Sequence, residues 1–198
     1  MKWIKYILWF SLLTVSALYS QGLQLGEARG LFLSVGVGPK IPIGEFSATN
    51  DLGIGFDITA SYTDNQVIPV FLYTKLAYQI FPGSTRMYKT SDYASFTTSE
   101  FLIAPGAKFY FPPVITDQIL IMPVAEAGIN LGFFFNSHVF KSSSGKSNID
   151  ETLTKFGFHI GGGLSMFFLE GLINYYYFPG NQVVSFDLKI QIPIFAKI

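Results

Sequence analysis

The chain of 198 residues contains no cysteine. This absence excludes a disulfide-stapled secreted domain, a thiolate metal site and an anchor on a lipidated cysteine. Charged residues are also scarce, at 13% of the chain, whereas ordinary soluble domains carry roughly 25%. Because 49% of the residues are hydrophobic, the composition indicates either a large core or an apolar surface that faces something other than water.

The chain has no excess of charge of either sign, and its formal net charge is zero. Without Lys2 and Lys5, 11 basic residues remain against 13 acidic residues, so nothing points to a nucleic acid as partner.

The chain has only two histidines, the residue type most often used as a catalytic base. Ser165 lies about 20 Å along a strand from His159, too far for a catalytic dyad. We therefore expect no enzymatic activity, no cofactor and no metal.

The first residues have the pattern of an export signal. Lys2 and Lys5 precede an apolar stretch over residues 6–18, and the small residues Ala17 and Ser20 lie around its end. This order is typical of a cleaved signal peptide, and the apolar run is shorter than the about 20 residues that a membrane-spanning helix needs. We predict a signal peptide over residues 1–20 and one exported domain over residues 21–198.

Residues 183–192, with the sequence VVSFDLKIQI, alternate between an apolar and a polar face. A period of two residues predicts a β-strand. Seven further stretches show this alternation or are rich in aromatic and β-branched residues, and they cover residues 31–38, 52–62, 70–81, 101–111, 119–135, 153–168 and 172–178. The sequence therefore predicts eight strands in an all-β domain.

The connections between these strands alternate in length. Long polar segments follow the first, third and fifth strands at residues 39–51, 82–99 and 136–152, whereas the intervening connections are short. Bacterial transmembrane barrels have short periplasmic turns and longer outer loops. The predicted fold is an eight-stranded antiparallel transmembrane β-barrel with its polar face inward. Pro105 and Pro123 interrupt predicted strands, and we expect bulges there.

A soluble barrel would show the same alternation with the apolar face inward. Residue size favours the membrane alternative, because glycine and serine gather on the polar face and suit a narrow, crowded lumen. Aromatic residues near strand ends are typical of the girdles at membrane interfaces. The candidates for such girdles are Tyr62, Tyr78, Phe81, Phe111, Phe133, Tyr176 and Phe178.

The stretch PIGEFS at residues 42–47, followed by GIGF at residues 53–56 and by Tyr62, resembles small bacterial outer-membrane barrels of the OmpX, OmpA-transmembrane and OmpW type. It is similar in particular to the porin-like outer-membrane β-barrel domain group common in Bacteroidota. The resemblance implies a Gram-negative outer-membrane protein with lipid, lipopolysaccharide and the barrel-assembly machinery as partners. One feature departs from the family, because such barrels usually end on an aromatic residue, whereas this chain ends in FAKI after Pro193.

The polar face supplies the candidate functional residues. Buried charges need partners, so the first hypothesis is a structural network that fills the lumen. A narrow channel for ions or small solutes is the second, and a soluble periplasmic lipocalin-like ligand-binding barrel is the third. The candidates for the lumen network are Asp57, Lys75, Lys108, Glu126, Lys155, His159, Asp187 and Lys189. Tyr88, Tyr93 and Phe96, in a predicted outer loop, are candidates for contact with a protein partner.

Overall fold

The computed structural model describes residues 29–64, 68–115, 120–166 and 168–197, and the predicted signal peptide lies outside these ranges. Eight long strands make up most of this part of the chain. They are β1 (Arg29–Ile43), β2 (Gly53–Asp64), β3 (Ile68–Pro82), β4 (Tyr93–Tyr110), β6 (Leu120–Phe140), β7 (Ile149–Met166), β8 (Leu169–Phe178) and β9 (Asn181–Lys197). A two-residue strand, β5 (Val114–Ile115), pairs with the start of β6.

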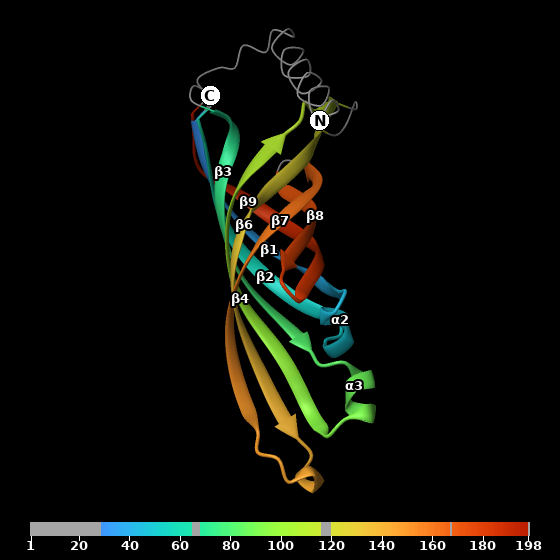
Figure 1. Ribbon diagram of the computed structural model, residues 1–198. Helices are drawn as coiled ribbons and strands as arrows, with labels where there is room; N and C mark the ends of the chain where they lie inside the picture. The colour runs from blue at the N-terminus through green and yellow to red at the C-terminus, as the bar shows by residue number, and fades with distance from the viewer. Residues whose placement is uncertain (1–28, 65–67, 116–119, 167, 198) are drawn as a thin grey trace, which may run out of the picture.

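The long strands form a closed ring (Figure 1). Their order is β4-β3-β2-β1-β9-β8-β7-β6, every pairing is antiparallel, and β4 pairs with β6 to close the circle. The first and last strands meet along almost their whole length, from Arg29 opposite Lys197 to Ile43 opposite Gln182. The predicted eight-stranded antiparallel barrel is confirmed. A ring of this size has an interior just wide enough for side chains.

The two faces of the strands lie as the alternation predicts. On β2, Ile54 and Phe56 are 61% and 55% exposed on the outside, whereas Asp57 and Thr59 are only 2% exposed inside the ring. Large apolar side chains cover the outer surface of the other strands as well. A soluble lipocalin-like barrel would have the reverse polarity. The soluble alternative is therefore wrong.

Three short helical segments lie in the connections at one end of the ring, which we call the loop end (Figure 1). They are α2 (Phe46–Thr49), α3 (Thr85–Thr90) and the 3-10 turn η1 (Ser142–Ser144). Within the described ranges, no helix is long and apolar enough to cross a membrane.

Three strands extend beyond their neighbours at the loop end (Figure 1). The pairing of β3 with β4 stops at Thr97, and the pairing of β8 with β7 starts only at Phe158. Residues 93–96 of β4, 136–140 of β6 and 149–157 of β7 therefore form a small sheet that we call the protruding sheet.

The outer connections are shorter than predicted, because the strands continue into segments that we expected to be loops. β1 runs on to Ile43, β4 already begins at Tyr93, and residues 136–140 and 149–152 belong to β6 and β7. The short connection expected at residues 169–171 is the start of β8. These segments are rich in serine, threonine and proline. Their local composition favours loops, but pairing with neighbouring strands decides the outcome.

The bulges expected at Pro105 and Pro123 are absent. Pro105 keeps its register with β3 and Pro123 keeps its register with β7. A proline removes one N–H group from the backbone hydrogen bonds between strands. Here this hydrogen bond is lost without an extra residue in the strand. A bulge lies in β9 instead, where Ile194 is skipped between the partners of Leu31 and Phe32.

Aromatic side chains gather inside the loop end. Phe81, Tyr176 and Phe178, which we expected in interface girdles, point inward and are almost fully buried. Residues 175–178 are all aromatic, so alternation could not show which of them face the lumen. The buried set, which we call the inner aromatic cluster, consists of Phe46, Ala77, Phe81, Leu102, Ala104, Phe134, Tyr176, Phe178 and Val183.

Candidate functional site

Charged side chains are buried inside the barrel. Among the described residues, four lysines and five carboxylates are each at most 4% exposed, and a buried charge needs a partner of opposite sign. Eight of them, which we call the lumen network, are ion-paired: Lys40, Lys75, Lys108, Lys189, Asp57, Glu126, Glu170 and Asp187. The ninth, Glu100, has no ion-pair partner among the described residues.

One half of the lumen network joins β9 to β1 and β2. Lys40 on β1 is ion-paired with Asp187 on β9. Lys189 Nζ on β9 lies 2.6 Å from Asp57 Oδ1 on β2. This second pair crosses β1 at Gly36, which is opposite both partners, and a Cβ atom there would lie 2.5 Å from an Asp57 oxygen. The missing side chain of Gly36 therefore lets one ion pair span three strands.

The other half joins β3, β4, β6 and β8. Lys75 Nζ lies 2.9 Å from Glu126 Oε1 and also donates to the hydroxyl of Tyr176 at 2.8 Å. Lys108 Nζ lies 3.4 Å from Glu126 Oε2 and is ion-paired with Glu170 as well. Glu126 thus sits between two lysines. Across both halves, every long strand except β7 contributes at least one charge.

His159 on β7 lies beside the lumen network. Its Nε2 is hydrogen-bonded to the hydroxyl of Tyr73, and its Nδ1 lies 2.6 Å from the side-chain oxygen of Asn130. The imidazole also stacks on the ring of Tyr176, with 5.4 Å between centroids. Both ring nitrogens are therefore engaged, which fixes the ring in place. No group of three or more metal-ligating side chains occurs in the part of the chain that the structure describes.

Seven of the eight residues predicted for the lumen network are buried inside the barrel. Lys155 differs, because it lies at the loop-end rim and is partly exposed. Its Nζ donates to the carbonyl oxygen of Pro179 and to Asn181 Oδ1, both at 2.9 Å. The ammonium group is thus bound by the β8–β9 turn rather than by a carboxylate of the lumen.

Three buried charged residues were not predicted from the sequence. Lys40, Glu100 and Glu170 all fell outside the predicted strands, in segments expected to be connections or their borders. For Lys40 a signal was present, because it continues the spacing of two residues that runs through Gly36 and Gly38. Glu100 shows the same signal, because it continues the spacing of two residues that runs through Gly106 and Lys108, whereas nothing comparable marked Glu170.

The three aromatic residues predicted for partner contact lie on two elements. Tyr88 is on α3, and its hydroxyl donates to the carbonyl oxygen of Phe96 at 3.0 Å. Tyr93 and Phe96 lie on β4, in the protruding sheet rather than in a loop. Their rings meet two residues of β6, since Tyr93 stacks on Phe140 at 4.7 Å and Phe96 lies 4.9 Å from His138.

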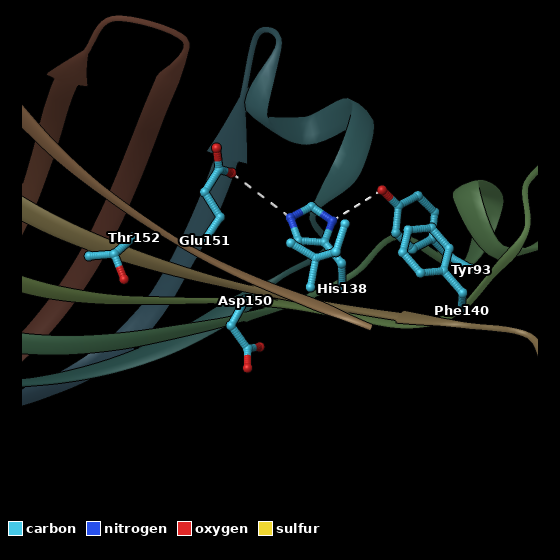
Figure 2. A pocket seen from close by; sticks show the side chains of 7 residues that line it. Tyr93, His138, Phe140, Asp150, Glu151 and Thr152 are labelled. Atoms are coloured by element: carbon cyan, nitrogen blue, oxygen red, sulfur yellow. Dashed lines mark hydrogen bonds and ion pairs between the residues drawn. The ribbon is translucent and has the colours of Figure 1, made fainter. Parts of the chain in front are cut away.

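An open pocket of about 550 Å³ lies at this aromatic group. Figure 2 shows His138 at its centre, between Tyr93 on one side and Glu151 on the other. The Tyr93 hydroxyl lies 3.0 Å from His138 Nδ1, and Glu151 Oε2 lies 3.9 Å from His138 Nε2. Aromatic faces beside a carboxylate suit ligands that combine a flat apolar surface with hydrogen-bond donors. The lining residues are Tyr93, His138, Phe140, Ile149, Asp150, Glu151 and Thr152.

An exposed ion pair ties the loops together beside this pocket. Lys146 Nζ lies 2.8 Å from Asp92 Oδ2, and this hydrogen bond and the positive charge hold the pKa of the Asp92 carboxyl below its usual value. The same ammonium group lies 5.5 Å from the ring centroid of Phe140. Lys141 Nζ donates to the carbonyl oxygens of Tyr88 and Ser91. The β6–β7 hairpin is thereby joined to the connection that holds α3.

No protein-family model matches the chain, and no curated protein matches it. Solved structures do match. The crystal structure of Neisserial surface protein A is similar with a TM-score of 0.53 and 15% sequence identity, over 83% of this chain and 97% of that one. The chain has the fold of the small eight-stranded outer-membrane β-barrels.

Two further outer-membrane barrels are similar at lower scores. The attachment invasion locus protein of Yersinia pestis, in complex with the heparin analogue sucrose octasulfate, has a TM-score of 0.48 and 12% identity, over 83% of this chain and 98% of that one. The N-terminal β-barrel domain of Pseudomonas aeruginosa OprF has a TM-score of 0.44 and 13% identity, over 83% and 99%.

The opposite end of this outer-membrane barrel fold carries a second hollow, of about 330 Å³. Tyr110 lines it, contacts the ring of Phe71 at 4.8 Å and donates its hydroxyl to Glu170 Oε2 at 2.9 Å. The lumen network thus lies between aromatic side chains at both ends. The lining residues are Phe32, Phe71, Tyr110, Met122, Ser165, Phe168, Gln191 and Pro193.

Proposed function

We propose that the protein is an outer-membrane barrel whose lumen is closed and which acts through its loop-end surface. The lumen network is the observation that carries this proposal. Four lysines and four carboxylates pair across an interior that is already narrow in an eight-stranded ring. Moving one of these side chains aside would separate buried charges, which is costly in an interior of low dielectric.

The outer surface supports residence in a Gram-negative outer membrane. Large apolar side chains such as Val37, Ile173 and Leu188 are about half exposed and face outward. Lipid chains are the partner that such a belt fits, with lipopolysaccharide in the outer leaflet. We further propose that the barrel-assembly machinery inserts the chain after export by the signal peptide over residues 1–20.

Conductance of the purified barrel in planar lipid bilayers tests the closed lumen. We expect no steady conductance from the wild type, because the lumen network holds its side chains across the interior. A steady conductance that changes in Lys75→Ala or Glu126→Ala, but not in the exposed Lys146→Ala control, would contradict closure and favour the narrow channel. That alternative has one observation in its support, since Asn130 and Asn174 carry buried polar atoms without partners, which suits water in the lumen.

The inner face of the protruding sheet is the surface that we propose for contact with a partner. A photo-crosslinking amino acid in place of Phe140 should give a discrete adduct on intact cells, and Tyr93→Ala should weaken it by removing the ring that stacks on this position. The same amino acid in place of Ile173, on the lipid-facing belt, is the control. Identical products from both positions would contradict a specific contact at the protruding sheet.

A further inference from the structure

Among the residues that the structure describes, Glu100 is the one buried carboxyl group outside the lumen network. It lies on β4 with its side chain inside the ring, 1% exposed. Its Oε1 has no hydrogen-bond partner, and neither of its oxygens forms an ion pair with a described residue. The other four buried carboxylates all have a lysine, so Glu100 breaks an otherwise complete set of pairs.

The surroundings of Glu100 are apolar on one side and amide on the other. On β6, a Cβ atom built at Gly132 would lie 3.0 Å from Glu100 Oε1 and 3.0 Å from the ring of Phe178, so the carboxyl lies at the edge of the inner aromatic cluster. On β3, Gln79 is directly opposite Glu100 and is also 1% exposed. The side-chain oxygen of Gln79 has no partner either.

No lysine or arginine among the described residues forms an ion pair with Glu100. Only Lys40 of β1 and Lys155 of β7 interact with it electrostatically. Lys40 is committed to Asp187, and Lys155 to the β8–β9 turn. The amide of Gln79 carries no charge, so it cannot neutralise a carboxylate in either orientation.

We infer that Glu100 keeps its proton in the folded barrel and donates it to the side-chain oxygen of Gln79. This single proton satisfies two buried oxygens that otherwise lack partners. It also balances the interior, because the four buried lysines then face four charged carboxylates. The acid–amide pair lies among residues of the inner aromatic cluster, since Phe81 and Ala77 flank Gln79 on the inward face of β3. This inference does not depend on whether the lumen conducts.

Proton binding at Glu100 has a consequence for stability. A glutamate in the unfolded chain loses its proton above about pH 4.3, whereas the folded barrel retains it. The folded state then binds more protons than the unfolded state, so stability falls as pH rises above that value. Glu100→Gln keeps the shape and the hydrogen-bond donor but cannot ionise. We expect its thermal unfolding midpoint in detergent to equal that of the wild type near pH 4 and to exceed it at pH 8.

Infrared spectroscopy gives a second measurement, and its deciding spectrum is that of the wild-type barrel. At pH 7 we expect the C=O stretch of a protonated carboxylic acid, shifted by deuterium exchange and absent from Glu100→Gln. Glu126→Gln is the matched control. It removes a carboxylate held by Lys75 and Lys108, so it should lower the unfolding midpoint at pH 7 and leave the infrared band in place.

Two results would overturn the inference. One is a wild-type spectrum at pH 7 without the protonated band. The other is a Glu100→Gln midpoint below that of the wild type at pH 8. If replacing sodium by a bulky organic cation also lowers the unfolding midpoint of the wild type at pH 8, the site holds a metal cation rather than a proton.

Discussion

At the scale of single residues, the buried ion pairs make the loss of one partner more harmful than the loss of both. Lys189 is fully buried against Asp57, so Lys189→Met leaves an unpaired carboxylate inside the barrel. We expect this variant to lose about 3–5 kcal/mol of the free energy of unfolding. Urea titration of the barrel in lipid vesicles measures the loss.

The double variant Lys189→Met with Asp57→Asn tests the reason for this loss. It removes both charges, so we expect it to recover a large part of the stability. Lys146→Met is the control, because its ion pair with Asp92 is exposed to solvent and should contribute nothing measurable. If the double variant were less stable than Lys189→Met alone, an unpaired charge would not be the cause.

At the scale of strands, the close approach of β9 and β2 across β1 depends on a missing side chain. A Cβ atom at Gly36 would lie 2.5 Å from Asp57 Oδ2 and 2.8 Å from Lys189 Cγ. Gly36→Ala should therefore displace this ion pair and cost about 1–3 kcal/mol in unfolding. Gly171→Ala is the matched control, since no atom lies within 4 Å of the added Cβ. Equal unfolding midpoints of both variants would contradict the crowding at Gly36.

The protruding sheet should be less protected than the ring. Residues 149–157 of β7 pair with β6 alone, whereas residues 158–165 pair with β6 and β8. Amides of the first segment that point away from β6 lack a partner strand and should exchange hydrogen with water faster. Hydrogen exchange followed by NMR in micelles measures this difference. Uniform protection along β7 would show that another group covers the outer edge of the protruding sheet.

Strand faces were predictable, and strand partners were not. Alternation along residues 52–62 and 183–192 depends only on local sequence, so it assigned Asp57, Asp187 and Lys189 to the inside correctly. The pairing of Lys75 with Glu126 joins residues 51 positions apart. It depends on register and on closure of the ring, which no local pattern encodes. Pro39 and Pro42 suggested a loop, but β1 continues through both, because its extent also depends on pairing with neighbouring strands.

At the scale of the whole molecule, the apolar belt determines where the barrel resides. Leu188 faces outward, is 58% exposed and lies near the middle of β9, opposite Val37 in the middle of β1. A charge at the bilayer midplane costs about 2–4 kcal/mol, and near the interface about 0–1 kcal/mol. Leu188→Arg should therefore reduce the folded fraction in membranes far more than Leu52→Arg at the loop end. The heat-modifiable gel shift of the folded barrel measures that fraction, and equal losses would contradict the proposed membrane position.

The ion pairs of the last strand also bear on the order in which the chain matures. Lys40 and Asp57 lie on the first and second strands, but their partners Asp187 and Lys189 lie on the last strand, which is synthesised last. Until β9 pairs with β1, the open barrel has two charges without partners on each side of the opening between these strands. Pairing of β9 with β1 therefore also neutralises these charges. A chain that ends before β9 lacks the partners of Lys40 and Asp57, so both charges stay unpaired.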